Sequence, residues 1–287
     1  LELVKEIDQI SYYDDSKGTN IDATVYAVTR LKENVILLAG GRGTRLSEET
    51  HLLPKPMIEI GEKPIIWHIM KHYSVFGIRE FIICAGYKAN VIKDYFLNYK
   101  ANNSSLHIDL NSNEVIFETK HEENWKVSIV DTGLKTNTAG RLKLIQNYIE
   151  EENFLMTYGD GVGDVNIEKL IKFHNNHGKL VTLTATIPEG RFGAISLKDD
   201  QVKSIKEKLD TADKFINGGF FVINKKALDY IENINHQWEM EPLTKIAKDG
   251  QLMAFKHRGF WKAMDHLRDK NQLDELASTD NPPWKTW

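Results

Sequence analysis

Short apolar runs alternate with amphipathic stretches over most of this chain. Short, largely apolar runs, which are typical of buried strands, lie at 35–39, 81–85, 127–130 and 154–158. Apolar residues at helical spacing predict a helix over about 64–76 and helices around Val91, Ile92, Tyr95 and Phe96, around Leu142, Ile145 and Ile149, and around Ile167, Leu170, Ile171 and His174. Strands and helices in this alternation indicate a parallel sheet covered by helices on both faces.

A β-rich segment lies at 181–187, and closely spaced strands continue from there to Ile223. These closely spaced strands predict an antiparallel or mixed addition that covers the sheet edge where the strands end. From Lys225 onward, helices and short strands alternate again. We therefore expect an α/β fold, with a Rossmann-like mixed, mostly parallel sheet flanked by helices and a smaller β-rich and C-terminal addition. Residues 34–287 would form this domain, after an N-terminal extension, 1–33, of unknown role.

Charge and composition limit the classes of partner. The chain has 287 residues, 41% of them hydrophobic, and its 37 basic and 41 acidic side chains give a net charge of −4. This balance gives no general attraction to nucleic acid or to an anionic membrane, so phosphate binding must come from a local basic site. No apolar segment approaches membrane-spanning length, and Cys84 alone can form neither an intrachain disulfide nor a thiolate zinc cluster. We expect a cytoplasmic protein.

A glycine-rich loop follows the first predicted strand and indicates a phosphate site. Gly40, Gly41 and Gly43 let an anion approach the backbone N–H groups, and Arg42 and Arg45 add positive charge. Lys55, between two prolines, can be aimed at the same anion. The loop is neither a Walker A loop, because no Gly-Lys-Ser/Thr occurs, nor a dinucleotide fingerprint, because Leu46 stands where its third glycine would be.

These residues resemble the signature of the sugar-1-phosphate nucleotidyltransferases. The matching segments, in chain order from about Asn34 to the end, are 40–46, 54–57, 61–64, 67–71, 81–88, 130–133, 157–161, 191–194, 216–221 and 283–287. The resemblance implies the nucleotide-diphospho-sugar transferase fold and transfer of a cytidylyl group from CTP to α-D-glucose 1-phosphate, which yields CDP-glucose and pyrophosphate. It also implies a homo-oligomer, a role in surface-polysaccharide synthesis, and no nucleic-acid or membrane partner.

The resemblance further implies the residues that act on the phosphates. Arg45 and Lys55 are the expected catalytic cations on the CTP phosphates, and Asp160 and Asp265 the expected ligands of Mg²⁺. The nucleophile is itself a phosphate anion, so no side-chain nucleophile is needed. Asp160 and Asp265 can meet only if the C-terminal segment returns to the sheet edge. Taken alone, Asp160 could be a turn residue and Asp265 a helix cap.

Substrate contacts are implied at further positions along the chain. The expected substrate-binding residues are Ala39, Gly40, Gly41, Gly43, Thr44, Arg141, Tyr158, Gly193, Glu207, Lys208, Asn217 and Gly218. Arg141, in a loop before a helix, would lie near the nucleotide, with a surface charge as the rival interpretation. Lys208 would hold the sugar phosphate, although Leu209 stands where the family has proline. Tyr158 could equally be a core aromatic residue.

Other functions remain open at this point. The same chemistry could use UTP or dTTP, and a regulatory protein that binds nucleotide sugars without catalysis could keep the fold. The joint presence of Arg45, Lys55, Asp160 and Asp265 argues against the regulatory alternative. No histidine spacing of a zinc site occurs, so zinc is not expected.

Overall fold

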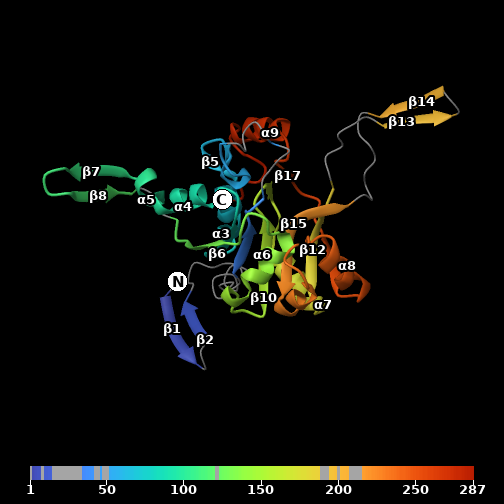
Figure 1. Cartoon of the computed structure of the whole chain (residues 1–287), viewed down its shortest axis with the longest axis horizontal. Helices are drawn as coiled ribbons and strands as arrows, with labels where there is room; N and C mark the ends of the chain where they lie inside the picture. The colour runs from blue at the N-terminus through green and yellow to red at the C-terminus, as the bar shows by residue number, and fades with distance from the viewer. Residues whose placement is uncertain are drawn as a thin grey trace.

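A computed structural model gives the arrangement of most of the chain (Figure 1). It describes residues 2–7, 10–14, 34–41, 46, 52–119, 123–187, 194–198, 201–206 and 215–287. For 2–7, 10–14, 194–198 and 201–206 the description covers the backbone. These four segments form two hairpins, one from β1 (Glu2–Ile7) and β2 (Ile10–Asp14), the other from β13 (Ala194–Lys198) and β14 (Gln201–Lys206).

A seven-stranded sheet is the centre of the fold, with the strand order β16-β12-β15-β10-β3-β6-β9. Its members are β3 (Val35–Leu38), β6 (Glu80–Ala85), β9 (Lys126–Asp131), β10 (Asn153–Tyr158), β12 (Val181–Thr186), β15 (Ile216–Asn224) and β16 (Leu252–Lys256). β15 runs antiparallel to both of its neighbours, whereas the other pairings are parallel. The expected mixed, mostly parallel sheet is confirmed.

β3 is buried on both faces. Val35 and Leu37 belong to one apolar cluster, and Ile36 and Leu38 to another on the opposite face. Because side chains alternate along a strand, this division means that packed layers cover the sheet on both sides. The continuous apolar run in the sequence reflects this double burial.

Helices form the two covering layers. They are α3 (Ile65–Val75), α4 (Ala89–Leu97), α5 (Tyr99–Asn102), α6 (Thr138–Leu144), α7 (Ile167–His177), α8 (Glu241–Lys248) and α9 (Leu267–Ala277). α3 and α7 pack into the cluster that contains Val35, and α6 and α8 into the cluster that contains Ile36. The predicted helix over about 64–76 is confirmed as α3. None of the described helices is long and apolar enough to cross a membrane.

The helix predicted from Leu142, Ile145 and Ile149 is shorter than expected. α6 ends at Leu144, a 3₁₀ turn follows at Gln146–Tyr148, and Ile149 lies beyond it in extended conformation. If α6 continued, the acidic residues 150–152 would lie at its C-terminal end, where the helix dipole is negative. Repulsion between these like charges disfavours a longer α6. Ile145 and Ile149 are nevertheless buried. The apolar spacing therefore predicted the burial of these residues correctly but not the length of the helix.

The strands between Ile187 and Ile223 differ in part from the predicted antiparallel or mixed addition, because β15 belongs to the main sheet. β12 and β15 are inner strands of the main sheet, and only β13 and β14 form a hairpin sheet of their own among the strands of this segment that the structure describes. Val181, Phe221 and Ile223 are buried in the main core. Apolar side chains on both faces favour the inside of a sheet over a half-exposed addition.

Short elements complete the fold. They are the 3₁₀ turns Lys55–Met57 and Lys225–Tyr230, the paired strands β4 (Glu59–Ile60) and β5 (Lys63–Pro64), the hairpin of β7 (Ser105–Asp109) and β8 (Glu114–Glu118), and the paired strands β11 (Gly161–Gly163) and β17 (Trp261–Ala263). The β11–β17 pair returns the C-terminal part of the chain to the edge where β10 ends.

Candidate active site

A cavity of about 250 Å³ opens where β3 and β10 end. Its lining consists of Leu38, Ala39, Gly40, Gly41, Lys55, Pro56, Thr136, Asn137, Thr138, Arg141, Tyr158, Gly159 and Asp160. In open α/β sheets, ligands bind beyond the carboxyl ends of strands, and this cavity has that position. The structure thus brings the start of the glycine loop together with Lys55, Arg141, Tyr158 and Asp160.

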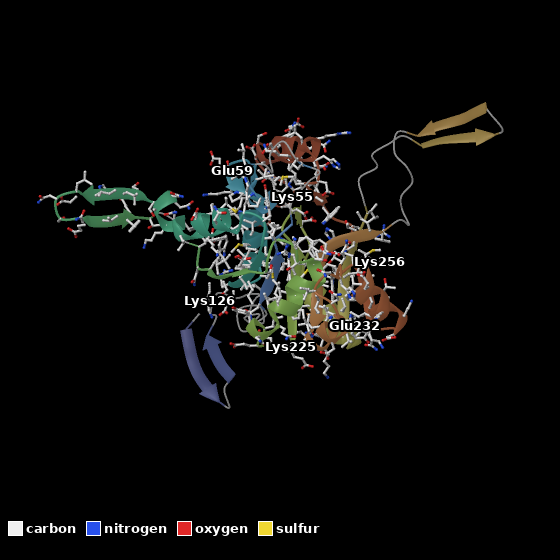
Figure 2. All side chains as sticks on the ribbon, viewed as in Figure 1. Lys55, Glu59, Lys126, Lys225, Glu232 and Lys256 are labelled. Atoms are coloured by element: carbon white, nitrogen blue, oxygen red, sulfur yellow. The ribbon has the colours of Figure 1, made fainter. Side chains whose placement is uncertain are left out.

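Lys55 lies at the centre of the charged groups and is labelled in Figure 2. It begins a 3₁₀ turn and is flanked by Pro54 and Pro56, which restrict the backbone on either side. Its Nζ is 2.7 Å from Oδ2 of Asp160 and 2.8 Å from Oδ1 of Asp265. One ammonium group therefore binds both of the carboxylates that the sequence assigned to a metal.

Backbone pairing, and not only Lys55, brings Asp160 and Asp265 together. β11 starts directly after Asp160, and β17 ends two residues before Asp265, at Ala263; the two strands pair antiparallel, with Gly161 opposite Ala263. The N–H of Met264 donates to the carbonyl of Asp160 at 2.8 Å. The expected return of the C-terminal segment to this edge is confirmed.

The start of α9 fixes the backbone at Asp265. His266 is the N-cap residue, and the carboxylate of Asp269 accepts from the N–H groups of Asp265 at 3.1 Å and His266 at 3.0 Å. The rival interpretation of Asp265 as the cap of this helix is therefore wrong. His266 accepts from the N–H groups of the first turn, so the helix start does not need the carboxylate of Asp265, which binds Lys55.

The charges of this group stabilise one another. Burial of the Lys55 ammonium acts to lower its pKa, but Asp160 and then Asp265 outweigh this effect, so the pKa of Lys55 lies above its ordinary value. The side chain of Lys55 is 11% exposed, against 33% for Asp160 and 32% for Asp265. Lys55 thus stays charged at neutral pH, and both carboxylates are partly open to solvent.

The chemistry of Asp160 and Asp265 would suit a magnesium ion if substrate phosphates supplied further ligands. Two carboxylates already converge on one cation, the ammonium of Lys55, which shows that the position between them attracts positive charge. Among the described residues, no cluster of three or more His, Cys, Asp or Glu side chains could hold a metal by itself. Mg²⁺ commonly binds through one or two carboxylates, water and substrate phosphates, and this donor set suits that arrangement.

Arg141 does not occupy the position that the sequence indicated. It lies inside α6 rather than in a loop before it, and at 4% exposure it is no surface charge. Its guanidinium donates to the carbonyls of Gly40 at 3.0 Å and Ala85 at 3.1 Å and to Oγ1 of Thr132 at 2.5 Å. The apolar pattern of α6 gave no sign of this burial, because a single arginine between apolar neighbours also fits an exposed helix face.

Gly40 has a role that a phosphate cradle alone would not explain. A Cβ atom at Gly40 would collide with the guanidinium of Arg141, and one at Gly86 would lie 2.6 Å from its Nη1. The two glycines therefore leave the space in which Arg141 reaches the backbone. The guanidinium links the ends of β3, β6 and β9 through these bonds and holds the backbone at Gly40, where the glycine loop begins.

Tyr158 belongs to a hydrogen-bonded group that includes a residue missed by the sequence analysis, Glu239. The hydroxyl of Tyr158 donates to Oε1 of Glu239, and the Thr138 hydroxyl donates to Oε2 at 2.9 Å. Asn217 Nδ2 donates to the Tyr158 hydroxyl at 3.4 Å. Burial, followed by the charge of Glu239, raises the pKa of Tyr158 well above its ordinary value, so Tyr158 remains a neutral donor.

Asn217 and Gly218 lie beside Tyr158. Oδ1 of Asn217 accepts from the N–H of Gly219 at 2.9 Å, and the carbonyl of Gly218 accepts from Nε1 of Trp261 at 2.6 Å. Gly219 has a φ of +76°, and a Cβ there would lie 2.7 Å from the Tyr158 ring. The glycine at 219 therefore gives close approach to Tyr158, and Trp261 supports the backbone at 218.

Several expected site residues lie outside the described part of the chain. They are Gly43, Thr44, Arg45, Gly193, Glu207 and Lys208. The structure describes Ala39, Gly40 and Gly41 from the glycine loop, together with Leu46 beyond it.

Comparisons with known proteins identify relatives of this chain. Residues 34–264 match the family model described as nucleotidyl transferase. The chain is 53% identical over 253 residues to glucose-1-phosphate cytidylyltransferase of Salmonella typhimurium, covering 88% of this chain and 98% of that protein. It is 41% identical to the probable glucose-1-phosphate cytidylyltransferase of Bacillus subtilis, covering 88% and 99%.

A solved structure supports the fold. HddC from Yersinia pseudotuberculosis superposes with a TM-score of 0.65 at 24% identity, covering 86% of this chain and 100% of that one. At 24% sequence identity, this structural similarity supports the fold but does not identify the substrate. With the sequence match over most of the chain, it follows that this chain belongs to the nucleotidyl transferase family.

Proposed function

We propose that this protein transfers a cytidylyl group from CTP to α-D-glucose 1-phosphate and releases CDP-glucose and pyrophosphate. The observation that carries the proposal is the convergence of Asp160 and Asp265 on Lys55, which lines one cavity together with Asp160 and the first residues of the glycine loop. The choice of substrates rests on the 53% identity to a relative named for them, of which the chain covers 98%.

The reaction needs little covalent help from the protein. A phosphate oxygen of glucose 1-phosphate forms a bond to the α-phosphorus of CTP, and the bond to the bridging oxygen of the β-phosphate breaks, with its electron pair leaving on pyrophosphate. Because the nucleophile is already an anion, the side chains need to hold two polyanions in line and offset their charge. Lys55 and the backbone of Gly40 and Gly41 line the cavity and suit the triphosphate.

Asp160 and Asp265 are the residues that would hold Mg²⁺. The ion would supply positive charge to the phosphates, and two half-buried carboxylates from separate segments give it a fixed place. Arg141 contributes by holding the Gly40 carbonyl, which sets the conformation of the loop next to the triphosphate. A cytoplasmic location goes with this proposal, because CTP is a cytoplasmic metabolite.

A screen of pyrophosphate release tests the function directly. CTP, UTP, dTTP and ATP would each be combined with several sugar 1-phosphates and Mg²⁺, and the released pyrophosphate measured. We expect the highest rate for CTP with glucose 1-phosphate. Binding of CTP without pyrophosphate release from any pair would instead favour a regulatory protein that binds nucleotide sugars.

We also propose that the protein is a homo-oligomer, because the β7–β8 hairpin has an uncovered apolar face. Leu106 is paired with Phe117 and Ile108 with Val115, and alternation along the strands places these four side chains on one face. They are 39–54% exposed. Figure 1 shows the hairpin extending away from the body of the molecule. A two-stranded hairpin is only marginally stable without cover, so a second copy is the expected partner.

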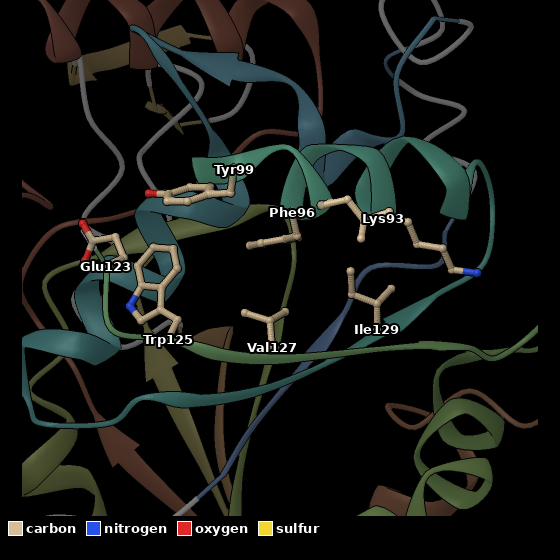
Figure 3. A pocket seen from close by; sticks show the side chains of 8 residues that line it. Lys93, Phe96, Tyr99, Glu123, Trp125, Val127 and Ile129 are labelled. Carbon is tan, nitrogen blue, oxygen red and sulfur yellow. The ribbon is translucent and has the colours of Figure 1, made fainter. Parts of the chain in front are cut away.

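A groove at the base of this hairpin offers a matching surface. It has a volume of about 470 Å³ and lies between α4 and β9, the edge strand of the sheet (Figure 3). Its lining is Lys93, Phe96, Leu97, Tyr99, Glu123, Trp125, Val127 and Ile129. An exchange of hairpins between two copies would cover both apolar surfaces. Sedimentation velocity tests this proposal: Ile108→Lys should release monomers, whereas Ile116→Lys, on the opposite face of the hairpin, should not.

A further inference from the structure

The cavity is lined by charged and by neutral polar side chains. Lys55, Asp160 and Arg141 contribute charge, whereas Thr136, Asn137, Thr138 and Tyr158 contribute neutral hydroxyl and amide groups. Charged groups suit phosphates. Neutral hydroxyl and amide groups suit the hydroxyl groups of a sugar ring.

Glu239 binds two of these neutral hydroxyl groups. Its carboxylate accepts from Tyr158 through one oxygen and from Thr138 through the other. Thr138 begins α6 and Tyr158 ends β10, so a single carboxylate links two elements that line the cavity. Both hydroxyl hydrogens are thereby directed to Glu239. Each oxygen also accepts one bond, Thr138 from the N–H of Trp238 at 2.8 Å and Tyr158 from Nδ2 of Asn217 at 3.4 Å. One acceptor position therefore remains on each hydroxyl for a ligand.

The charge of Glu239 has no cationic partner among the ion pairs between described residues. A half-buried carboxylate held by two neutral hydroxyls is costly for stability alone, since an apolar or amide side chain would avoid the loss of hydration. The same arrangement has a clear use in orientation. An anionic acceptor fixes both hydroxyl rotors more strongly than a neutral group does.

We propose that Glu239 is a positioning residue for the reaction: its carboxylate orients the hydroxyls of Tyr158 and Thr138 so that they bind hydroxyl groups of a substrate sugar ring. The ring is either the hexose of the sugar phosphate or the ribose of CTP, and both present the same chemistry. The proposal rests on the proposed function for its choice of assay. Its geometric basis, the contacts of Glu239, is independent of that choice.

Glu239→Gln and Tyr158→Phe test the proposal. Glutamine keeps the size of the side chain but removes the charge, and phenylalanine removes the hydroxyl. We expect Glu239→Gln to raise KM for one substrate by ~10-fold or more, with kcat within ~3-fold of the wild type. If KM rises for glucose 1-phosphate, the two hydroxyls bind the hexose ring. If KM rises for CTP, they bind the ribose ring. The double variant should be no worse than the more damaged single variant, because both changes break one interaction.

Glu232→Gln is the matched control. Glu232 is exposed, pairs with Lys245, and lies well apart from Lys55 in Figure 2. Its variant should keep both KM values. If Glu239→Gln leaves both KM values unchanged, or lowers only kcat together with the melting temperature, Glu239 is structural and the proposal is overturned.

A binding measurement separates this proposal from the proposed function. Calorimetry with CDP-glucose should show weaker binding to Glu239→Gln than to the wild type and to Glu232→Gln. If the wild type releases no pyrophosphate from CTP and glucose 1-phosphate, the proposed function fails on its own. Equal CDP-glucose affinity in wild type and Glu239→Gln, with the wild type active, would overturn the positioning role alone.

Discussion

The carboxylates of Asp160 and Asp265 converge on the same ammonium group, that of Lys55, at 2.7 and 2.8 Å. Pairing of β11 with β17 brings them together although they are far apart in the chain. The two aspartates thus form a preorganised anionic pair at the cavity, and Lys55 is the group that balances it. This relationship underlies the predictions on catalysis.

Asp160→Asn should reduce turnover by orders of magnitude while the protein stays folded. The substitution removes a charge that, in our proposal, serves Mg²⁺, whereas the amide keeps the shape of the side chain. Steady-state rates and circular dichroism would be measured together. Asp229→Asn, at an exposed carboxylate, is the control and should keep full activity. Near wild-type turnover in Asp160→Asn would contradict the metal assignment.

Lys55→Ala and Lys208→Ala should affect different substrates. Lys55 lines the cavity beside Gly40 and Gly41, so its loss should damage the use of CTP. Lys208, assigned to the sugar phosphate by resemblance, should chiefly raise KM for glucose 1-phosphate. Initial rates with each substrate varied in turn would separate the two effects. Damage to the same substrate in both variants would show that one lysine is misassigned.

Arg141→Lys should lower kcat/KM for CTP by ~10- to 100-fold although the charge is retained. A lysine cannot bond at once to the carbonyls of Gly40 and Ala85 and the hydroxyl of Thr132, so the glycine loop loses its support. Thr132→Val, which removes one acceptor, should cause a smaller loss in the same direction. An unchanged kcat/KM in Arg141→Lys would mean that charge alone matters at this position.

The free energy of unfolding should decrease as the pH falls below about 6.5, the ordinary pKa of histidine. His72 is buried, and burial lowers its pKa from 6.5 to about 4, against the opposing effect of its bond to the carbonyl of Val165. The unfolded chain therefore binds more protons between these values, so unfolding becomes easier as the pH falls from 6.5 to 4. Between these two pH values, His72 lowers the free energy of unfolding by roughly 3 kcal/mol.

Urea unfolding at a series of pH values checks this contribution. His72→Asn should flatten the pH dependence between 6.5 and 4 relative to the wild type, even if it lowers stability at pH 7. His174, whose pKa burial also lowers to about 4, should leave part of the slope in place. An identical slope in the wild type and His72→Asn would contradict the assignment.

Much of the architecture could be predicted from the apolar pattern. The run at 35–38 gave a doubly buried strand, and the spacing of Ile66, Met70 and Tyr73 gave α3, because burial imposes these periods directly. The place of β12 and β15 could not be predicted, since a buried strand in the middle of a sheet and one in an addition have the same local pattern. Strand order depends on contacts distant in sequence.

The site was predictable only in part for the same reason. Lys55, Asp160 and Gly40 stand in recognisable motifs, so the sequence found them. Arg141 was found, but its buried bonds depend on the ends of three separate strands. Glu239 stands in no motif, and only the fold places its carboxylate beside Tyr158 and Thr138.

The choice of base tests the central claim most directly. The exocyclic amino group of cytosine donates where uracil and thymine have an acceptor, so a site that pairs with this donor prefers CTP, while the shared O2 still permits weak use of UTP. The measurement is kcat/KM for CTP, UTP, dTTP and ATP, side by side, with glucose 1-phosphate and Mg²⁺. We predict CTP first, UTP far behind and no turnover with ATP. A higher kcat/KM for UTP or dTTP than for CTP would contradict cytidylyl transfer.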